Sequence, residues 1–309
     1  MAFISVVIPI FREEAILEKL VTLLNATLEP VHPDYEILFV LDGGKDRSWE
    51  ILTALAAHDP RIKAIEFSRN FGQHLAISAG LDHCDGDWVV VMDGDLQDRP
   101  EVIPLLFRKA MEGYDVVFVA RRQRKESRFY LAMVQGFHWL FQTLSGTHTD
   151  PDIGNFSILS RQVVENYRSL REELRFYGGI IHWLGFRHAI IPAEQAERLT
   201  GTSGYLGWNK RIRLATHIIL AHSERPLYIS AAIGLIMASG SFLIGLYFLT
   251  IALMDGVDVP GWASLMVALF FNTGLILGVL GINGIYLGKI FSAVKQRPLY
   301  VVARRIGLP

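Results

Sequence analysis

Short apolar runs alternate with segments of helical periodicity through the first 120 residues of the chain. Runs rich in β-branched and aromatic residues predict strands, and apolar positions at helical spacing between them predict helices. Strands that alternate with helices are typical of βαβ units, so we predict an α/β domain with a mostly parallel, doubly wound sheet. The predicted strands cover 3–9, 35–41, 62–67, 89–92 and 115–120, and the predicted helices cover 15–24, 49–57, 75–81 and 105–111.

The hydrophobic pattern changes after Gly207. Residues 208–226 mix basic and apolar side chains, which predicts an amphipathic juxtamembrane helix at a membrane surface. An ordinary surface helix is the alternative. Residues 227–254 and 259–288 carry no charged side chain, and each stretch exceeds the roughly 20 apolar residues that span a bilayer. Two transmembrane helices are therefore predicted.

These patterns divide the chain into three parts. We expect a first domain over 1–207, the juxtamembrane helix over 208–226 and a two-helix transmembrane domain over 227–309 that ends in a basic tail. Lysine and arginine residues flank the pair of spans, whereas the loop between the spans holds only Asp255 and Asp258. The positive-inside rule therefore predicts a multi-pass inner (plasma) membrane protein with its first domain and both ends in the cytoplasm.

Composition narrows the class of protein. The net charge of the 309 residues is −1, so no overall basic field indicates a nucleic-acid partner. The single cysteine, Cys84, excludes an internal disulfide and indicates a reducing compartment. A strand pattern begins at Phe3 without a charged leader before it, so we expect no cleavable signal peptide.

Polar residues and glycines follow the predicted strands. Because carboxyl ends of parallel strands meet at one edge of a sheet, the loops should converge on one crevice. Asp93 and Asp95 can flank one hard cation, and Gly94 lets the backbone approach closely; Mg²⁺ prefers one or two carboxylates plus substrate phosphates. A surface turn is the alternative, because Asp-Gly pairs are common in turns. The strand ends carry Arg12-Glu13, Asp42-Gly43, Arg69-Asn70, Asp93-Gly94-Asp95 and Arg121.

Several motifs in this order resemble glycosyltransferase family 2, and within it the polyprenyl-phosphate glycosyltransferases. Those enzymes invert the anomeric centre and have a nucleotide-sugar-binding GT-A (Rossmann-like) fold. The resemblance runs from about Ser5 to Pro226, and the two spans match the bacterial undecaprenyl-phosphate branch. Its most specific parts are Arg69-Asn70-Phe71-Gly72 with Ala79-Gly80-Leu81, and Met92 through Asp98 followed by Pro100-Glu101.

The resemblance implies roles for individual residues. Asp93 and Asp95 would hold Mg²⁺ or Mn²⁺ as part of the catalytic site, together with Arg121 and Asn155. Asn155 stands where the family has a carboxylate that contacts the sugar or acts as a base. The donor site would comprise Pro9, Phe11, Glu13, Asp42, Asn70, Asp93, Gly94, Asp95 and Gln97, and the lipid-phosphate site Arg121, Arg124, Ser127 and Arg198.

Two of these assignments are weighed against simpler ones. The arginines after residue 120 could be a solvated charge run, but they follow a strand on the ligand edge. Asp98 is expected to cap the following helix or to hold its loop rather than to bind metal.

The implied reaction moves one sugar from a UDP- or GDP-sugar to undecaprenyl phosphate on the cytoplasmic membrane face, for cell-envelope glycan synthesis or modification. A lipid phosphate is already an anion, so it needs positioning by arginines more than deprotonation, which makes Asn155 tolerable. The resemblance and a glycine stripe in the second span also predict a homo-oligomer, of which a tetramer is one form. The glycines are Gly274, Gly278, Gly281, Gly284 and Gly288.

Two alternatives stay open. A processive polysaccharide synthase would carry a Gln-x-x-Arg-Trp segment and more spans, and the sequence has neither. A non-catalytic membrane scaffold would explain the departures from the family pattern at Leu41, Gly44, Asn155 and Gly204, but the intact Asp93 and Asp95 argue against it. Neither the sugar nor the nucleotide base follows from the sequence.

Overall fold

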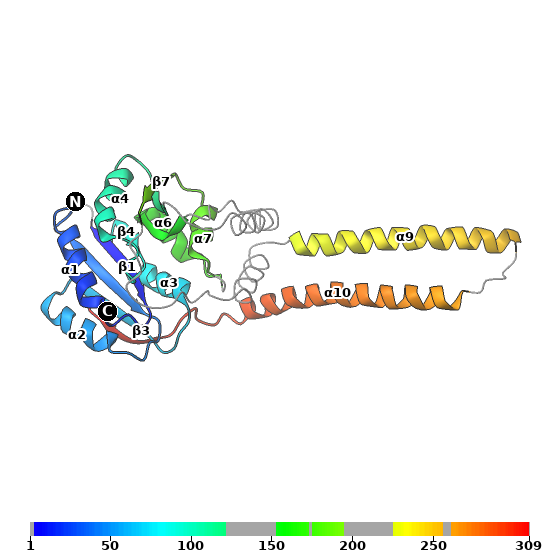
Figure 1. Ribbon diagram of the computed structural model, residues 1–309, viewed down its shortest axis with the longest axis horizontal. Helices are drawn as coiled ribbons and strands as arrows, with labels where there is room; N and C mark the ends of the chain where they lie inside the picture. Colours follow the sequence, from blue (N-terminus) through cyan, green and yellow to red (C-terminus); the bar gives the residue numbers. More distant parts are fainter. Residues whose placement is uncertain (1–2, 122–152, 173–174, 195–224, 256–260, 309) are drawn as a thin grey trace. The chain divides into compact units, whose positions relative to one another are not determined.

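The computed structural model describes the chain in two compact units (Figure 1). One unit contains a mixed sheet with its helices and includes the C-terminal residues from Pro298 onward. The other contains two long apolar helices. The described residues are 3–121, 153–172, 175–194, 225–255 and 261–308.

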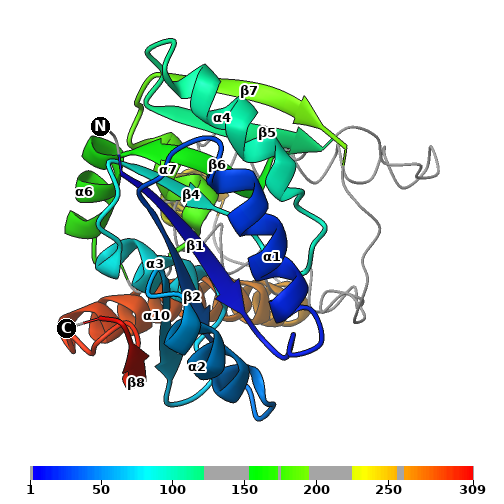
Figure 2. The ribbon, with the colours of Figure 1, turned by 90° about the vertical axis from the view of Figure 1, so that its left-hand side faces the viewer.

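An eight-stranded sheet forms the first of these units, as far as the described residues show (Figure 2). Its order is β7-β5-β6-β4-β1-β2-β3-β8. The strands β4, β1, β2 and β3 pair in parallel, as do β5 and β7, whereas β6 and β8 are antiparallel to their neighbours. The predicted mostly parallel α/β fold is confirmed. The strands are β1 (Ile4–Ile10), β2 (Tyr35–Leu41), β3 (Ile62–Phe67), β4 (Trp88–Val91), β5 (Val116–Arg121), β6 (Ile153–Ser160), β7 (His188–Ala193) and β8 (Val302–Ile306).

Helices cover both faces of the sheet. One face packs against α1, α2 and α4, and the other against α3, α6 and α7. Both faces of β1 and β2 are therefore buried, which explains why these strands are nearly continuous apolar runs. The helices of this unit are α1 (Leu17–Leu28), α2 (Ser48–His58), α3 (Gln73–His83), the short 3₁₀ turn η1 (Pro100–Val102), α4 (Ile103–Ala110), α6 (Arg161–Ser169) and α7 (Tyr177–Trp183).

Three polar side chains near the amino ends of β1, β2 and β3 interact with one another. Ser5 donates its hydroxyl to the Glu36 carboxylate, and Lys63 Nζ lies 2.6 Å from the other Glu36 oxygen. The backbone N–H of Asp85 donates to the Glu36 carboxylate, and that of Gly86 donates to the Ser5 hydroxyl oxygen. The loop between α3 and β4 is thereby held at the opposite end of the strands from Asp93.

Strands β6, β7 and β8 are not among the predicted elements. Each depends on a partner that is distant in sequence; β6 pairs antiparallel with both β4 and β5. The clearest difference concerns β8. Its Arg304-Arg305 pair reads as a basic tail of the transmembrane domain, but in the structure β8 extends the sheet by pairing antiparallel with β3 (Figure 1).

The second unit consists of α9 (Arg225–Asp255) and α10 (Trp262–Val294), which run side by side in opposite directions (Figure 1). Each contains a candidate membrane span, over Leu227–Ile244 and Phe271–Val294. Almost no side chain in these windows is buried by the protein. Such a surface is stable against hydrocarbon rather than water. The amphipathic helix predicted just before α9 falls mostly outside the described residues.

The glycine stripe of α10 is open in this part of the structure. A Cβ atom built at any of its glycines would meet no atom within 4 Å. The described part of α9 therefore does not use the stripe for close helix packing. The stripe glycines are Gly274, Gly278, Gly281, Gly284 and Gly288, and self-association through them stays a prediction.

The contact between α3 and β1 depends on Gly80. A Cβ atom at this position would lie 2.1 Å from Val7 Cγ1, so α3 would have to move away from the sheet. We expect Gly80→Ala to lower the free energy of unfolding by about 1–3 kcal/mol, measured as a fall in the melting temperature of the full chain in detergent. Adding Val7→Ala should recover part of the loss. Gly178→Ala in α7 is the control, because its Cβ would meet nothing closer than 4.0 Å. Equal stability of Gly80→Ala and the parent would contradict the packing.

The imidazole of His74 in α3 is largely covered and packs against the ring of Phe176, with the ring centroids 5.3 Å apart. Burial lowers the pKa of His74 to about 4. Between that value and the ordinary pKa near 6.5, the unfolded chain binds the proton and the folded chain does not. Stability should therefore fall as the pH falls through this window, by up to about 1.4 kcal/mol per pH unit. We expect His74→Leu to flatten the fall in melting temperature between pH 6.5 and 4; an unchanged slope would rule out this contribution.

Candidate functional site

The loop after β4 packs directly onto the end of β1. A Cβ atom at Gly94 would lie 2.3 Å from Ile10 Cδ1 and 3.0 Å from a carboxylate oxygen of Glu13. A side chain at this position would force the Ile10 and Glu13 side chains to shift. Gly94 thus brings Glu13 beside the two aspartates, as the convergence of strand ends predicts.

Asp42, at the end of β2, holds the loop that follows β3. Its two carboxylate oxygens accept hydrogen bonds from the backbone N–H groups of Phe71 at 2.6 Å and Gly72 at 2.8 Å. Gly43 has φ +66°, and a Cβ there would lie 2.2 Å from the carbonyl carbon of Arg69. Burial raises the pKa of the Asp42 carboxyl, and the two N–H donors oppose that shift. Asp42 therefore orders the segment 69–72 at the edge of the sheet.

The segment after β4 forms a tight turn that its own carboxylates stabilise. The backbone N–H of Gln97 donates to Asp95 at 3.0 Å, and that of Asp93 donates to Asp98 at 3.1 Å. Leu96 has φ +60°, a backbone conformation that costs energy for a side chain of this size. Asp98 holds the loop, one of the two roles expected for it.

Two amides meet at the carboxylate of Asp93. Gln73 Nε2 donates to Asp93 Oδ1 at 2.6 Å, and Asn155 Nδ2 lies 3.4 Å from the same oxygen. Gln73 begins α3, and Asn155 lies in β6. The structure therefore brings the predicted residues Asp93 and Asn155 together and adds Gln73. A signal for Gln73 exists in the sequence, because it directly follows the Arg69-Asn70-Phe71-Gly72 motif.

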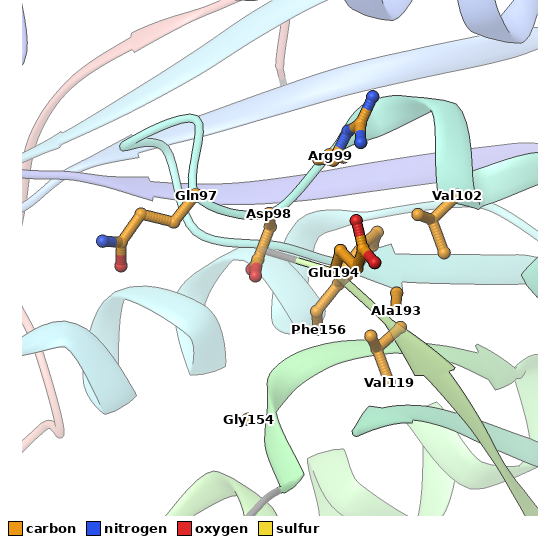
Figure 3. Close-up of a pocket in the computed structure, with 9 residues that line it drawn as sticks. All are labelled: Gln97, Asp98, Arg99, Val102, Val119, Gly154, Phe156, Ala193 and Glu194. Carbon is orange, nitrogen blue, oxygen red and sulfur yellow. The ribbon is translucent and has the colours of Figure 1, made fainter. Parts of the chain in front are cut away.

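A pocket lies beside the end of the carboxylate turn (Figure 3). Asp98 and Glu194 contribute carboxylates to it, from the turn and from the end of β7. Gly154 and Phe156 of β6 and Val119 of β5 supply less polar surface. Gln97 also lines it, although Figure 3 shows its amide pointing away from the other labelled side chains. The turn that carries Asp93 and Asp95 is thus followed directly by residues that line a hollow with two further carboxylates.

The remaining predicted residues have different positions. Pro9 lies within β1, and Phe11, 44% exposed, follows the strand with the Arg12 guanidinium 5.1 Å from its ring centroid. The Asn70 carbonyl accepts a hydrogen bond from Arg69. Arg121 is the last residue of β5. Arg124, Ser127 and Arg198 lie outside the described residues.

The carboxylates of Asp93 and Asp95 suit a hard divalent cation that is also coordinated by a bound ligand. Asp93 and Asp95 offer carboxylate oxygens one residue apart on a rigid turn. No group of three or more histidine, cysteine, aspartate or glutamate side chains able to hold a metal occurs within the described ranges. Two carboxylates leave coordination positions for phosphate oxygens, as Mg²⁺ prefers. The residues present therefore fit a metal held jointly with a diphosphate.

Comparison with known proteins identifies the family. The chain is 37% identical over 302 residues to the SfII prophage-derived bactoprenol glucosyl transferase of Shigella flexneri, covering 97% of each protein. It is 35% identical to YkcC of Bacillus subtilis, an uncharacterized glycosyltransferase, over 98% of this chain and 94% of that protein. The mannosyltransferase PcManGT of Pyrobaculum calidifontis, solved in complex with GDP-Man and Mn²⁺, has a similar fold, with a TM-score of 0.50 and 17% sequence identity. The match covers 95% of this chain and 86% of that one. The model of glycosyl transferase family 2 matches residues 5–168, and the chain belongs to this family of glycosyltransferases.

Proposed function

We propose that this enzyme transfers a single sugar from a nucleotide-diphosphate sugar to a polyprenyl phosphate at a membrane. The observation that carries the proposal is the near-full-length similarity to a bactoprenol glucosyl transferase, which includes both apolar helices as well as the sheet. Glucose is accordingly the first sugar to test. Undecaprenyl phosphate is the corresponding lipid acceptor.

The donor would bind along the edge formed by Glu13, Asp42 and the segment 69–73, with its diphosphate at Asp93 and Asp95. Breaking the anomeric bond places negative charge on the departing diphosphate. A bound Mg²⁺ or Mn²⁺ would neutralise that charge. The two aspartates would hold the ion, and Gln73 and Asn155 would orient Asp93 through its Oδ1 atom.

A phosphate acceptor fits the amide at position 155. A lipid phosphate attacks as an anion, so no carboxylate has to remove a proton from it. Asn155 Nδ2 lies 3.4 Å from Asp93 Oδ1, and an aspartate there would bring a second negative charge against the metal ligand. We propose that Arg121, Arg124, Ser127 and Arg198 position the acceptor phosphate, since arginine forms strong, directional bonds with phosphate oxygens.

The sheet supports the proposed membrane topology. The chain leaves the sheet unit before α9, and β8, which follows α10, pairs with β3 of that same unit. A chain that returns to the side from which it left crosses a membrane an even number of times, which two spans satisfy. From the basic residues at both outer ends of the pair we infer that the sheet lies in the cytoplasm.

The reaction can be tested with purified full-length protein in detergent, Mn²⁺ and undecaprenyl phosphate. UDP- and GDP-sugars are supplied one at a time, and the lipid products are identified by mass. We expect one donor to give polyprenyl phosphate plus one sugar. Products with several sugars per lipid would favour a processive synthase. Failure of every donor to give a lipid product would contradict the proposal.

The metal role predicts that Asp95→Asn lowers kcat roughly 100-fold or more, the order seen when one electrostatic stabiliser of a transition state is removed. The asparagine keeps an oxygen for the N–H of Gln97, so the turn persists while the charge is lost. Asp87→Asn is the matched control: Asp87 precedes β4, is exposed and accepts a hydrogen bond from the Phe3 N–H. Its activity should equal that of the parent. Full activity of Asp95→Asn would exclude the metal role.

A further inference from the structure

The residues after α10 form a segment that we name the C-terminal strap, residues 300–308. Tyr300, Val302 and Leu308 pack against the hydrophobic cluster that contains α3, and Ile306 packs against the cluster on the other face of the sheet. Arg304 pairs with Glu66. The strap is thus a packed part of the catalytic unit, although the sequence reads as a charged tail.

The strap contacts the end of β3, just before the segment 69–73 that we propose binds the sugar donor. The backbone N–H of Ser68 donates to the Val301 carbonyl at 3.0 Å. The ring of Tyr300 stacks on Phe67, the last residue of β3, with centroids 5.1 Å apart and an angle of 18° between the planes. Phe67 also contacts Phe71, whose ring lies edge-on with the centroids 5.5 Å apart. An aromatic chain therefore connects the strap to the segment 69–72.

Tyr300 is also held at the far end of α3. Its hydroxyl donates to Asp82 Oδ2 at 2.8 Å, and Arg171 Nη1 donates to the same oxygen at 2.7 Å. Burial raises the pKa of Tyr300, so the hydroxyl keeps its proton and remains a donor at neutral pH. Tyr300 therefore contacts Phe67, which precedes the segment 69–73, and Asp82, near the end of α3. The segment between these two contacts includes Gln73, which begins α3 and bonds to Asp93.

We propose that Tyr300 is a positioning residue for donor binding, acting through Phe67 and Phe71 on the segment 69–73. This inference rests on the proposed function. The segment is already fixed on one side by Asp42, which accepts the Phe71 and Gly72 N–H groups. Tyr300 supports it through Phe67, which contacts the Phe71 ring. Neither residue of the Tyr300–Phe67 pair touches the acceptor in this account, so the effect is on the nucleotide sugar alone.

The test compares KM for the nucleotide sugar, KM for undecaprenyl phosphate and kcat in full-length variants. Tyr300→Ala removes the stacked ring and should raise the donor KM about three- to tenfold, the equivalent of one aromatic pair, with acceptor KM and kcat close to those of the parent. Tyr300→Phe keeps the stacked ring and loses only the hydrogen bond to Asp82. Its donor KM should therefore lie between that of the parent and that of Tyr300→Ala. Val301→Ala is the control, because that side chain is 46% exposed and its backbone carbonyl is retained.

A purely structural role gives a different result. Loss of folded enzyme would lower kcat and leave both KM values unchanged, and a donor KM in Tyr300→Ala equal to that of the parent would overturn the proposal. Tyr300→Phe, the milder change, supplies the comparison if Tyr300→Ala does not fold. Calorimetric titration with UDP or GDP in Mn²⁺ separates this inference from the reaction itself. If no sugar is transferred, weaker nucleotide binding by Tyr300→Ala than by the parent still supports the positioning role. Equal affinity of the two proteins, or no nucleotide binding by the parent, overturns it.

Discussion

Parallel pairing of β4 with β1, and of β1 with β2, is the constraint on which the site depends. The register Val7↔Val91 and Ile10↔Leu41 ends these strands together, so Asp93, Glu13 and Asp42 emerge at one edge. Parallel strands need helical crossovers, and these cover both faces and keep water from the strands. The candidate site residues on these strands therefore lie at the carboxyl edge of the sheet.

Close packing of those loops gives the site its rigidity. Gly94 leaves room for Ile10 and Glu13, and Gly43 leaves room for the backbone of the segment 69–70. The strained turn at Leu96 is held by bonds from backbone N–H groups to Asp95 and Asp98. Carboxylates fixed in this way need little reorganisation when a diphosphate departs, and such preorganisation is a large part of electrostatic catalysis.

The sequence pattern predicted the parallel strands and the turn after β4, because their signals lie within a few consecutive residues. The bounds of β2 and β3 match the predicted strands 35–41 and 62–67, because these strands are rich in β-branched and aromatic residues. Asp93-Gly94-Asp95 was recognisable because a strand ends there. The antiparallel β6 and β8 were not predicted, since their pairing depends on distant partners. The contact of Gln73 with Asp93 depends on the residue at which α3 begins, and predicted helix ends are the least certain feature of a sequence pattern.

The central claim is that Asp93 and Asp95 bind a diphosphate through a shared divalent cation. Calorimetric titration of the full-length protein with the nucleoside diphosphate of its active donor, with Mn²⁺ or with chelator, tests this most directly. We predict binding at least about tenfold tighter with Mn²⁺, a difference of roughly 1.4 kcal/mol or more, and loss of that difference in Asp93→Asn. Equal affinity with metal and with chelator would contradict the account.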